Sequence, residues 1–311
     1  MKRALVTGGA GFIGSNLVST LVEQGVPVRV LDNFSYGKKE NLASVIGRIE
    51  LIEGDLRDKE AVKQAVADVE VIFHQGALRS VPKSVDDPEP YNDVNVTGTL
   101  NLLMAAKEAG VRRVVSASSS SVYGDNPELP KVETQYPFPI SPYAASKLAT
   151  EGYCQTFSAV YGLSTVSLRY FNVFGPRQDP GSEYAVVIPA FITAILDDKA
   201  PTIHGDGLQS RDFTYIDDVV QANILAGTAP GLSGQALNIA CGANHTVLDI
   251  VKHTNKILGK DVKPQHIAAR QGDVRHTLAD ITAARKLIRF EPKVMFEEGL
   301  QRTIEWFQKQ S

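Results

Sequence analysis

Short apolar runs alternate with amphipathic segments through the first half of the chain. The apolar runs are continuous, which is typical of strands in a parallel sheet covered on both faces. In the segments between them, apolar residues recur at helical spacing. The expected strands are residues 4–7, 28–31, 50–52, 69–73, 113–117 and 165–168, and the expected helices are residues 12–24, 59–66, 92–109 and 143–161. This alternation predicts an α/β fold of Rossmann type, with a doubly wound parallel sheet.

The pattern changes after about Phe174. Residues 175–181 read Gly-Pro-Arg-Gln-Asp-Pro-Gly, a composition that favours turns. The later elements are shorter and mixed, and helices are expected at residues 186–196, 217–226, 247–258, 281–288 and 296–310. We therefore predict a dinucleotide-binding lobe, residues 1–171, and a smaller mixed α/β lobe that binds substrate, residues 172–311. Some segments of the second lobe are expected to return to the large sheet.

Composition and charge exclude several classes of protein. The 311 residues carry a formal net charge of −3, without the basic stripe that indicates a nucleic-acid partner. No run approaches the roughly 18 apolar residues of a membrane span. The first residues lack the apolar region of a signal peptide, so the cytoplasm is the expected location. Cys154 and Cys241 are expected to be free thiols, and the histidine spacing predicts no metal site.

Three glycines, Gly8, Gly11 and Gly14, lie between the first expected strand and the first expected helix. In dinucleotide-binding folds such glycines allow a tight turn and close approach of the pyrophosphate to the helix N-terminus. Asp32 ends the second strand, where an acid accepts the ribose hydroxyls and repels a 2′-phosphate. The sequence therefore favours NAD over NADP. Further motifs follow the third and fourth strands, at the edge where such sheets bind ligands, and they contain Asp55, Leu56, Gln75 and Ala77.

Tyr143 and Lys147 form a Tyr-x-x-x-Lys pair on one face of an expected helix. A free tyrosine has a pKa near 10, and a nearby ammonium group lowers that pKa toward the range of a general base. A hydroxyl-rich segment, residues 116–124, leaves the fifth expected strand. Serines at the carboxyl end of a strand are placed to hydrogen-bond a sugar hydroxyl. The two segments together predict a site for proton transfer.

These motifs together resemble the extended short-chain dehydrogenase/reductase family, and within it the UDP-hexose 4-epimerases. TGGAGFIG from Thr7, SSSSVYG from Ser118 and YAASK from Tyr143 occur in the family's order. The likeness covers essentially the full length of the chain. It continues through LRYFNVFGPR from Leu168, GDGLQSRDF from Gly205 and RQGDV from Arg270.

The resemblance implies a role for each matching position. Tyr143 would be the acid and base, Lys147 would bind the nicotinamide ribose and lower the pKa of Tyr143, and Ser119 would bond the reacting 4-hydroxyl. The NAD site would be lined by Phe12, Ile13, Asp32, Asn33, Asp55, Leu56, Ala77, Asn95 and Tyr170. The substrate's diphosphate would be held by Asn172, Arg211 and Arg270, its uridine by Asp273 and His204, and its 2-substituent would be walled by Thr277.

The implied reaction is a 4-epimerisation that needs no second substrate. Tyr143 would take the proton of the 4-hydroxyl while C4 gives a hydride to bound NAD, leaving a 4-keto sugar. The sugar would then turn over, and the hydride would return to its other face. The expected pairs are UDP-glucose with UDP-galactose and, because Thr277 is small, the N-acetylated sugars as well.

Departures from the family's patterns keep other readings open. Dehydratases carry acidic residues beside the serine motif, where this chain has Ser120 and Ser121. Some hexose epimerases carry an asparagine pair where this chain reads Ala-Val-Val, ending at Val187. Arg79 is expected near the nicotinamide and could meet a carboxylate, which leaves a UDP-glucuronate 4-epimerase open, although plain hexose epimerases also carry a basic residue there.

The least expected readings are a sugar-nucleotide dehydratase or decarboxylase and a non-catalytic NAD-binding scaffold. A scaffold would tolerate loss of Tyr143, Lys147 and Ser119, all of which are present. The resemblance also suggests a homodimer, formed through a four-helix bundle built from residues 92–109 and 143–161 of each chain.

Overall fold

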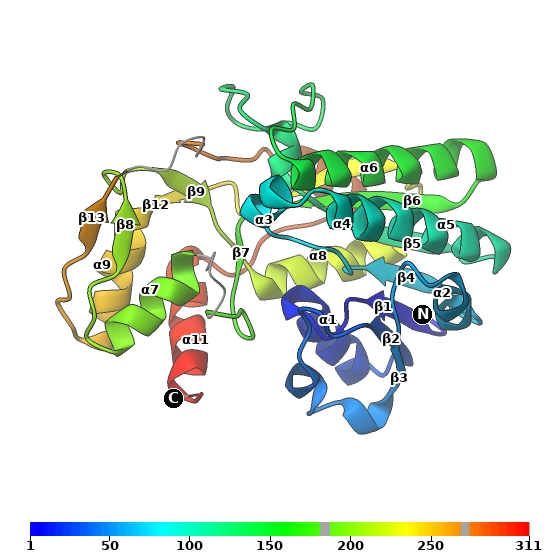
Figure 1. Ribbon diagram of the computed structural model, residues 1–311, viewed down its shortest axis with the longest axis horizontal. Coiled ribbons are helices and arrows are strands. Elements are labelled where there is room, and N and C mark those ends of the chain that lie inside the picture. The colour runs from blue at the N-terminus through cyan, green and yellow to red at the C-terminus, as the bar shows by residue number, and fades with distance from the viewer. Residues whose placement is uncertain (181–186, 269–273, 311) are drawn as a thin grey trace.

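The computed structural model describes residues 1–180, 187–268 and 274–310. Within them the largest element is a parallel seven-stranded sheet in the order β11-β6-β5-β4-β1-β2-β3 (Figure 1). Its strands are β1 (Ala4–Thr7), β2 (Val28–Asp32), β3 (Ile49–Glu53), β4 (Val71–His74), β5 (Arg113–Ser119), β6 (Ser164–Tyr170) and β11 (Gln235–Ile239). The predicted Rossmann-type sheet is confirmed, including a strand contributed by the second half of the chain.

Helices cover both faces of this sheet. Helices α2 (Lys59–Val66), α5 (Gly98–Glu108) and α6 (Pro142–Tyr161) pack side by side on one face. Helices α1 (Phe12–Glu23) and α8 (Ile216–Thr228) pack together on the other (Figure 1). The central strands β1, β2 and β4 are buried along their whole length, which explains their continuous apolar sequence.

The smaller elements lie beside the sheet, at the left of Figure 1. Helices α7 and α11 both pack against α9, and each of the small sheets pairs two short strands. These elements are β7 (Val173–Phe174), α7 (Val187–Leu196), β8 (Thr202–His204), β9 (Ser210–Asp212), β10 (Thr214–Tyr215), β12 (Asn244–Thr246), α9 (Val247–Leu258), β13 (Gln265–Ile267) and α11 (Phe296–Gln308). Helix α10 (Thr282–Ile288) packs instead against β11 and α8. The division into two lobes at residue 171 stays a prediction.

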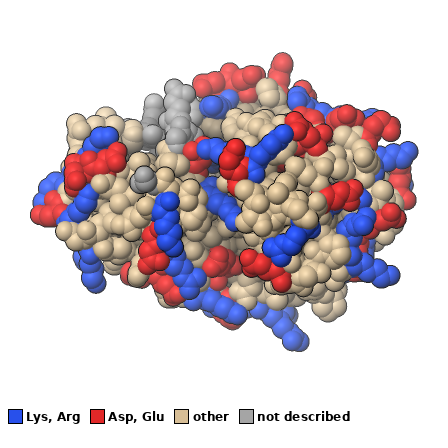
Figure 2. Space-filling view, turned by 90° about the horizontal axis from the view of Figure 1, so that it is seen from below, with Lys and Arg blue, Asp and Glu red and all other residues tan. Residues whose placement is uncertain are grey.

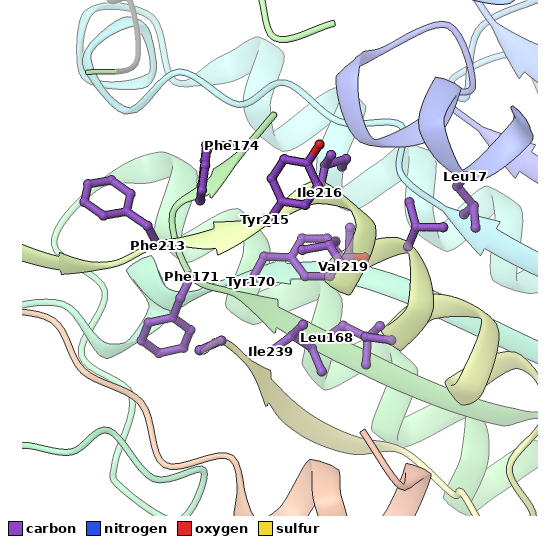
Figure 3. Close-up of a cluster of buried hydrophobic side chains, with 14 of the residues drawn as sticks. Leu17, Leu168, Tyr170, Phe171, Phe174, Phe213, Tyr215, Ile216, Val219 and Ile239 are labelled. Atoms are coloured by element: carbon purple, nitrogen blue, oxygen red, sulfur yellow. The ribbon is translucent and has the colours of Figure 1, made fainter. Parts of the chain in front are cut away.

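An aromatic core joins these smaller elements to the large sheet. The side chains of Tyr170 and Phe171, at and just after the end of β6, lie close to those of Phe174, Phe213 and Tyr215 (Figure 3). The ring of Phe174 packs edge-on against both Phe213 and Tyr215, with centroids 6.2 Å and 5.6 Å apart. Such aromatic contacts are worth about 0.5–1.5 kcal/mol beyond the area they bury, so this core ties the two parts of the chain together.

Most predicted elements of the first half are present, with ends that differ by one or two residues. The strand expected to end at residue 117 continues to Ser119, and the helix expected from residue 92 begins as a π-helical segment, η3 (Asn92–Thr97), before α5. Several short elements were not predicted. They are η1 (Lys39–Leu42), η2 (Ile46–Arg48), α3 (Val81–Asp86), α4 (Glu89–Tyr91), η4 (Ser120–Tyr123) and the short strands of the second half.

The surface shows no dominant charge on the face seen in Figure 2, where acidic and basic side chains are interspersed. Among the described residues, no helix is both long and apolar enough to cross a membrane. The same part of the chain holds no cluster of side chains suited to a metal ion, and Cys154 and Cys241 are not joined to each other.

Candidate active site

A cleft of about 890 Å³ opens at the carboxyl edge of the large sheet. Residues that follow or end β1 to β6 line it, as expected for ligand sites in such sheets. The structure brings together here every predicted cofactor-binding residue except Asn95. These cleft-lining residues are Gly8, Gly11, Phe12, Ile13, Gly14, Asp32, Asn33, Asp55, Leu56, Gln75, Ala77, Tyr143, Lys147 and Tyr170.

The glycine loop is packed too closely for side chains at its critical positions. A Cβ on Gly8 would lie 2.7 Å from the Cα of Gly76, and one on Gly14 would lie 2.1 Å from the carbonyl oxygen of Gly8. Gly8 also has a φ of +64°, which favours glycine. The bare backbone leaves the N-terminus of α1 open to the cleft, where its N–H groups can receive a phosphate.

Asp32 presents its carboxylate at the end of β2. Its Oδ2 accepts the N–H of Ala10 and its Oδ1 accepts the N–H of Phe34, both at 2.8 Å. Burial raises the pKa of Asp32, and these two hydrogen bonds oppose the rise. Because a carboxylate oxygen accepts more than one hydrogen bond, both oxygens can still accept from ribose hydroxyls. The loop and this carboxylate fit NAD.

Tyr143 is placed by three elements around the start of α6. Its phenol lies beside Ser119 at the end of β5, and Ser119 favours the phenolate. Its backbone N–H donates to the Oγ of Ser84 in α3, over 3.1 Å, and its ring meets that of Tyr91 edge-on with centroids 6.5 Å apart. The sequence did not predict α3 or α4, so two of these three elements were missed.

Polar and charged groups surround Tyr143. Burial raises the pKa of Tyr143, and Ser119 and the positive charge of Arg79 oppose that rise. The expected effect of Lys147 on this pKa stays a prediction, and its Nζ donates to the carbonyl oxygen of Ala117 over 2.9 Å. Burial lowers the pKa of Lys147 to about 8. In this arrangement Arg79 is the cation that favours the phenolate of Tyr143.

The serine segment is part strand and part 3₁₀-helix rather than a loop. Ser118 and Ser119 end β5, and Ser120 and Ser121 begin η4. Ser121 donates to the Oγ of Ser119 over 2.9 Å. Ser119 is therefore held on one side by Ser121 and on the other by Tyr143, which orients its hydroxyl beside the phenol.

Asn95 lies behind the cleft wall. Its side chain accepts the N–H of Leu78 at 2.8 Å and donates to the carbonyl oxygen of Leu78 at 3.0 Å and to Ser146 at 2.9 Å. Leu78 precedes Arg79, and Ser146 lies between Tyr143 and Lys147 on α6. In the structure Asn95 thus ties the Arg79 loop to the helix that carries the Tyr-x-x-x-Lys pair.

Three of the expected substrate residues meet around a buried carboxylate. Asp212 accepts the N–H groups of Cys241, Gly242 and Ala279 at 2.9–3.2 Å, and burial raises its pKa to about 7. Its own N–H donates to Thr277 over 3.2 Å, and its carbonyl oxygen accepts from Asn172 over 3.3 Å. Arg211 precedes it in β9.

The other expected substrate residues are spread along the smaller elements. His204 ends β8, with its Nδ1 3.3 Å from the carbonyl oxygen of Ala268, and Val187 is the first residue of α7. Arg270 and Asp273 lie outside the described residues. The structure therefore brings together more of the predicted cofactor-binding residues than of the predicted substrate-binding residues.

Several cleft-lining residues were missed by sequence reasoning. Arg177 fixes the turn after β7 to α1, because its Nη1 donates to the carbonyl oxygen of Ser15 and to Ser19 at 2.8 Å and 3.0 Å. Lys38 and Asp179 form an ion pair of 3.4 Å between two cleft-lining segments. Trp306, on α11, reaches the same cleft from the far end of the chain. The turn composition after Phe174 was the only local signal for any of them.

Comparison with known proteins agrees with this geometry. Residues 4–240 match the NAD dependent epimerase/dehydratase family. A UDP-glucose 4-epimerase of Mycolicibacterium smegmatis is 40% identical over 99% of both chains. The chain belongs to the NAD dependent epimerase/dehydratase family, which forms part of the extended short-chain dehydrogenases/reductases. As a member of this family, it uses NAD as its cofactor.

Two solved structures share the whole fold. A UDP-N-acetylglucosamine 4-epimerase from Methanobrevibacter ruminantium M1, in complex with UDP-N-acetylmuramic acid, is 42% identical with a TM-score of 0.96, and the match covers 100% of this chain and 99% of that one. A UDP-glucuronic acid 4-epimerase from Bacillus cereus, in complex with UDP-glucuronic acid and NAD, is 32% identical with a TM-score of 0.92, over 99% and 100% of the two chains. The similar proteins thus differ in the sugar that they bind.

The carboxylate of Asp32 should set the cofactor preference. We expect purified protein to release NAD(H), and not NADP(H), on denaturation, because a carboxylate at this place repels a 2′-phosphate. Asp32→Asn removes the charge with little change in shape and should reduce the ratio of the affinities for NAD and NADP. An enzymatic assay of the released nucleotide and binding measurements with both cofactors check this. Mainly NADP(H) from the unchanged protein would contradict it.

Proposed function

We propose that this protein is a UDP-sugar 4-epimerase that interconverts UDP-glucose and UDP-galactose and also accepts the N-acetylated pair. The observation that carries the proposal is that Tyr143 and Lys147 line one cleft built for NAD, with Ser119 beside the phenol of Tyr143. Several proteins to which the chain is similar, at 32–42% identity, are 4-epimerases of UDP-sugars, and one that is 33% identical is a UDP-N-acetyl-alpha-D-glucosaminuronate decarboxylase.

The residues of the cleft have separate roles in the reaction. Bound NAD supplies a hydride acceptor and, for the return step, a hydride donor. Ser119 holds the 4-hydroxyl of the sugar, and Tyr143 takes its proton and later gives it back, which is general acid–base catalysis. Arg79 and Ser119 favour the phenolate of Tyr143 against the effect of burial. Lys147, fixed on Ala117, presents its remaining N–H groups to the ribose.

The positions beside the catalytic serine support epimerisation over dehydration. Elimination of water needs a further acid and base, and related dehydratases carry acidic residues at this point of the motif. Here Ser120 and Ser121 occupy it, and Ser121 donates its hydrogen bond to Ser119. This segment therefore supports the serine that holds the sugar and adds no acid.

Arg79 supports a second candidate, a UDP-glucuronate 4-epimerase. Its exposed side chain lines the cleft, and its charge acts on Tyr143. A guanidinium in this place can pair with the carboxylate of a uronate. We rank this candidate second because the influence of Arg79 on Tyr143 serves either sugar.

The proposal includes a homodimer through α5 and α6. These neighbouring helices carry apolar side chains that are exposed in the single chain: Met104 at 39%, Val160 at 65% and Tyr161 at 48%. Exposed apolar groups on adjacent helices favour association with a matching surface. For the location we propose the cytoplasm, which agrees with two cysteines that do not pair with each other.

The dimer is tested by mass and by one substitution on its surface. We expect the protein to have twice the mass of one chain in analytical ultracentrifugation, and Val160→Asp to shift it toward a monomer because a charge would be buried in the interface. Val85→Asp, at a residue of α3 that is 62% exposed, is the control and should leave the mass unchanged. A single-chain mass for the unchanged protein would contradict the dimer.

Turnover of UDP-sugars tests the proposed function itself. Incubation with UDP-glucose, UDP-galactose, their N-acetylated forms and UDP-glucuronate, followed by chromatographic separation of the C4 epimers, should show interconversion of the first two pairs. Tyr143→Phe should lower the rate by about 10²–10⁴ because it removes the general acid and base. The variant should still fold and bind UDP. Activity within a few-fold of the unchanged protein would contradict the role of Tyr143.

Thr277 is expected to set the tolerance for an N-acetyl group. Thr277→Tyr should lower the rate on UDP-N-acetylglucosamine about 10-fold or more beyond its effect on UDP-glucose, because specificity would come from a clash. Since Thr277 also accepts a hydrogen bond from the N–H of Asp212, Thr277→Val is the matched control that removes the hydroxyl without adding bulk. Equal losses on both sugars in the tyrosine variant would show that Thr277 is not the gate.

A further inference from the structure

A buried ion pair lies one helical turn beyond Lys147. Glu151 and Arg169 form two hydrogen bonds, from Nε to Oε1 at 2.9 Å and from Nη2 to Oε2 at 2.7 Å. Their side chains are only 9% and 5% exposed. Ser118 also donates a hydrogen bond to Oε1 of Glu151, over 2.5 Å. The proton-transfer scheme above assigns no task to this group.

The register of α6 places this pair next to the cleft. Tyr143, Lys147 and Glu151 are spaced by four residues, so they share one face of α6. That face lies along β5 and β6 (Figure 1). All three residues interact with the carboxyl end of β5, Tyr143 with Ser119, Lys147 with Ala117 and Glu151 with Ser118.

The other titratable groups around Lys147 carry no charge near neutral pH. Burial lowers the pKa of His74, on β4, to about 3, and raises that of Cys154, on α6, to about 11. Burial also raises the pKa of Tyr143 and brings that of Tyr170 to about 12. Arg79 is exposed at the cleft, where water screens its charge. The charge left to act on Lys147 inside the protein is that of Glu151, which is paired with Arg169.

We infer that Glu151 is a positioning residue that, paired with Arg169, keeps the ammonium of Lys147 protonated and fixed on the carbonyl of Ala117. The inference deepens the proposed function and rests on it for its catalytic meaning. Burial alone disfavours the charged form of a lysine, and Glu151 opposes that effect. Arg169 in turn holds the carboxylate of Glu151 in place through two hydrogen bonds.

Two single substitutions should shift the pKa of Lys147 in opposite directions. Glu151→Gln leaves Arg169 as an unpaired buried cation, so the pKa of Lys147 should fall, by about 1 pH unit or more. Arg169→Met leaves the carboxylate of Glu151 unpaired, so the pKa of Lys147 should rise. The double variant Glu151→Gln/Arg169→Met removes both charges and should return the pKa of Lys147 to between those of the single variants.

NMR titration measures this without turnover. Protein labelled with ¹³C at the lysine ε-carbon is titrated, and the Lys147 signal is assigned by its loss in Lys147→Met. Glu50→Gln is the matched control. Glu50 pairs with the buried Arg29 at 2.9 Å, on strands β2 and β3 far from Lys147, so this variant also leaves a buried arginine without its carboxylate partner. It should leave the Lys147 titration unchanged. The alkaline limit of kcat/KM should move to lower pH in Glu151→Gln only.

The outcomes separate this inference from the proposed function. An unchanged Lys147 titration in a folded Glu151→Gln protein, or an equal shift in Glu50→Gln, overturns the inference whatever the epimerase activity. If Glu151→Gln does not fold, the sign of the pKa shift of Lys147 in Arg169→Met and in the double variant tests the inference. A fall in the pKa of Lys147 in Arg169→Met overturns the inference. Opposite shifts in a protein that epimerises no UDP-sugar would contradict only the proposed function.

Discussion

The fit of α6 against the ends of β5 and β6 is the constraint on which the chemistry of the cleft depends. The four-residue spacing on the helix puts Tyr143, Lys147 and Glu151 on one face, and each of them has a separate partner near the carboxyl end of β5. A rotation of the helix by one residue would break all three contacts. The buried pair of Glu151 with Arg169 makes such a rotation costly, because it would leave two charges unpaired in the interior.

A second buried carboxylate organises the substrate side. Asp212 collects three backbone N–H groups from segments far apart in the sequence, and its own backbone contacts Asn172 and Thr277. The aromatic core of Phe174, Phe213 and Tyr215 fixes this region to the large sheet (Figure 3). The two halves of the proposed site thus meet through packing that involves neither cofactor nor sugar.

The cofactor half could be predicted from the sequence because its signals are local. Gly8 and Asp32 lie at the ends of strands whose apolar runs are easily recognised, Gly14 lies in the first turn of the helix that follows, and the cleft contains them all. Tyr143 and Lys147 followed from spacing alone, but the charge that acts on Tyr143 did not. Whether Lys147 or Arg79 faces the phenol depends on how the loop after β4 folds, and that depends on long-range contacts of Asn95.

The remaining features of the site could not be predicted from local sequence patterns, because they too depend on long-range contacts. Helix α3 has six residues, too few for a periodic signal, although it supplies Ser84 to the backbone of Tyr143. Glu151 reads in the sequence as an ordinary polar helix position, and only the arrival of Arg169 from β6 explains its burial. Asp212 lies in the GDGLQSRDF motif, but nothing in that motif indicates its burial, because its partners come from residues 241, 242 and 279.

The central claim is that the hydrogen at C4 leaves the sugar as a hydride, is kept within the cleft, and returns to the opposite face. Epimerisation of UDP-galactose that carries deuterium at C4, without added cofactor, tests this most directly. The account predicts that the UDP-glucose formed keeps the deuterium at C4 and takes up no hydrogen from water there, as mass spectrometry and NMR would show. Loss of the deuterium to water in step with turnover would contradict it.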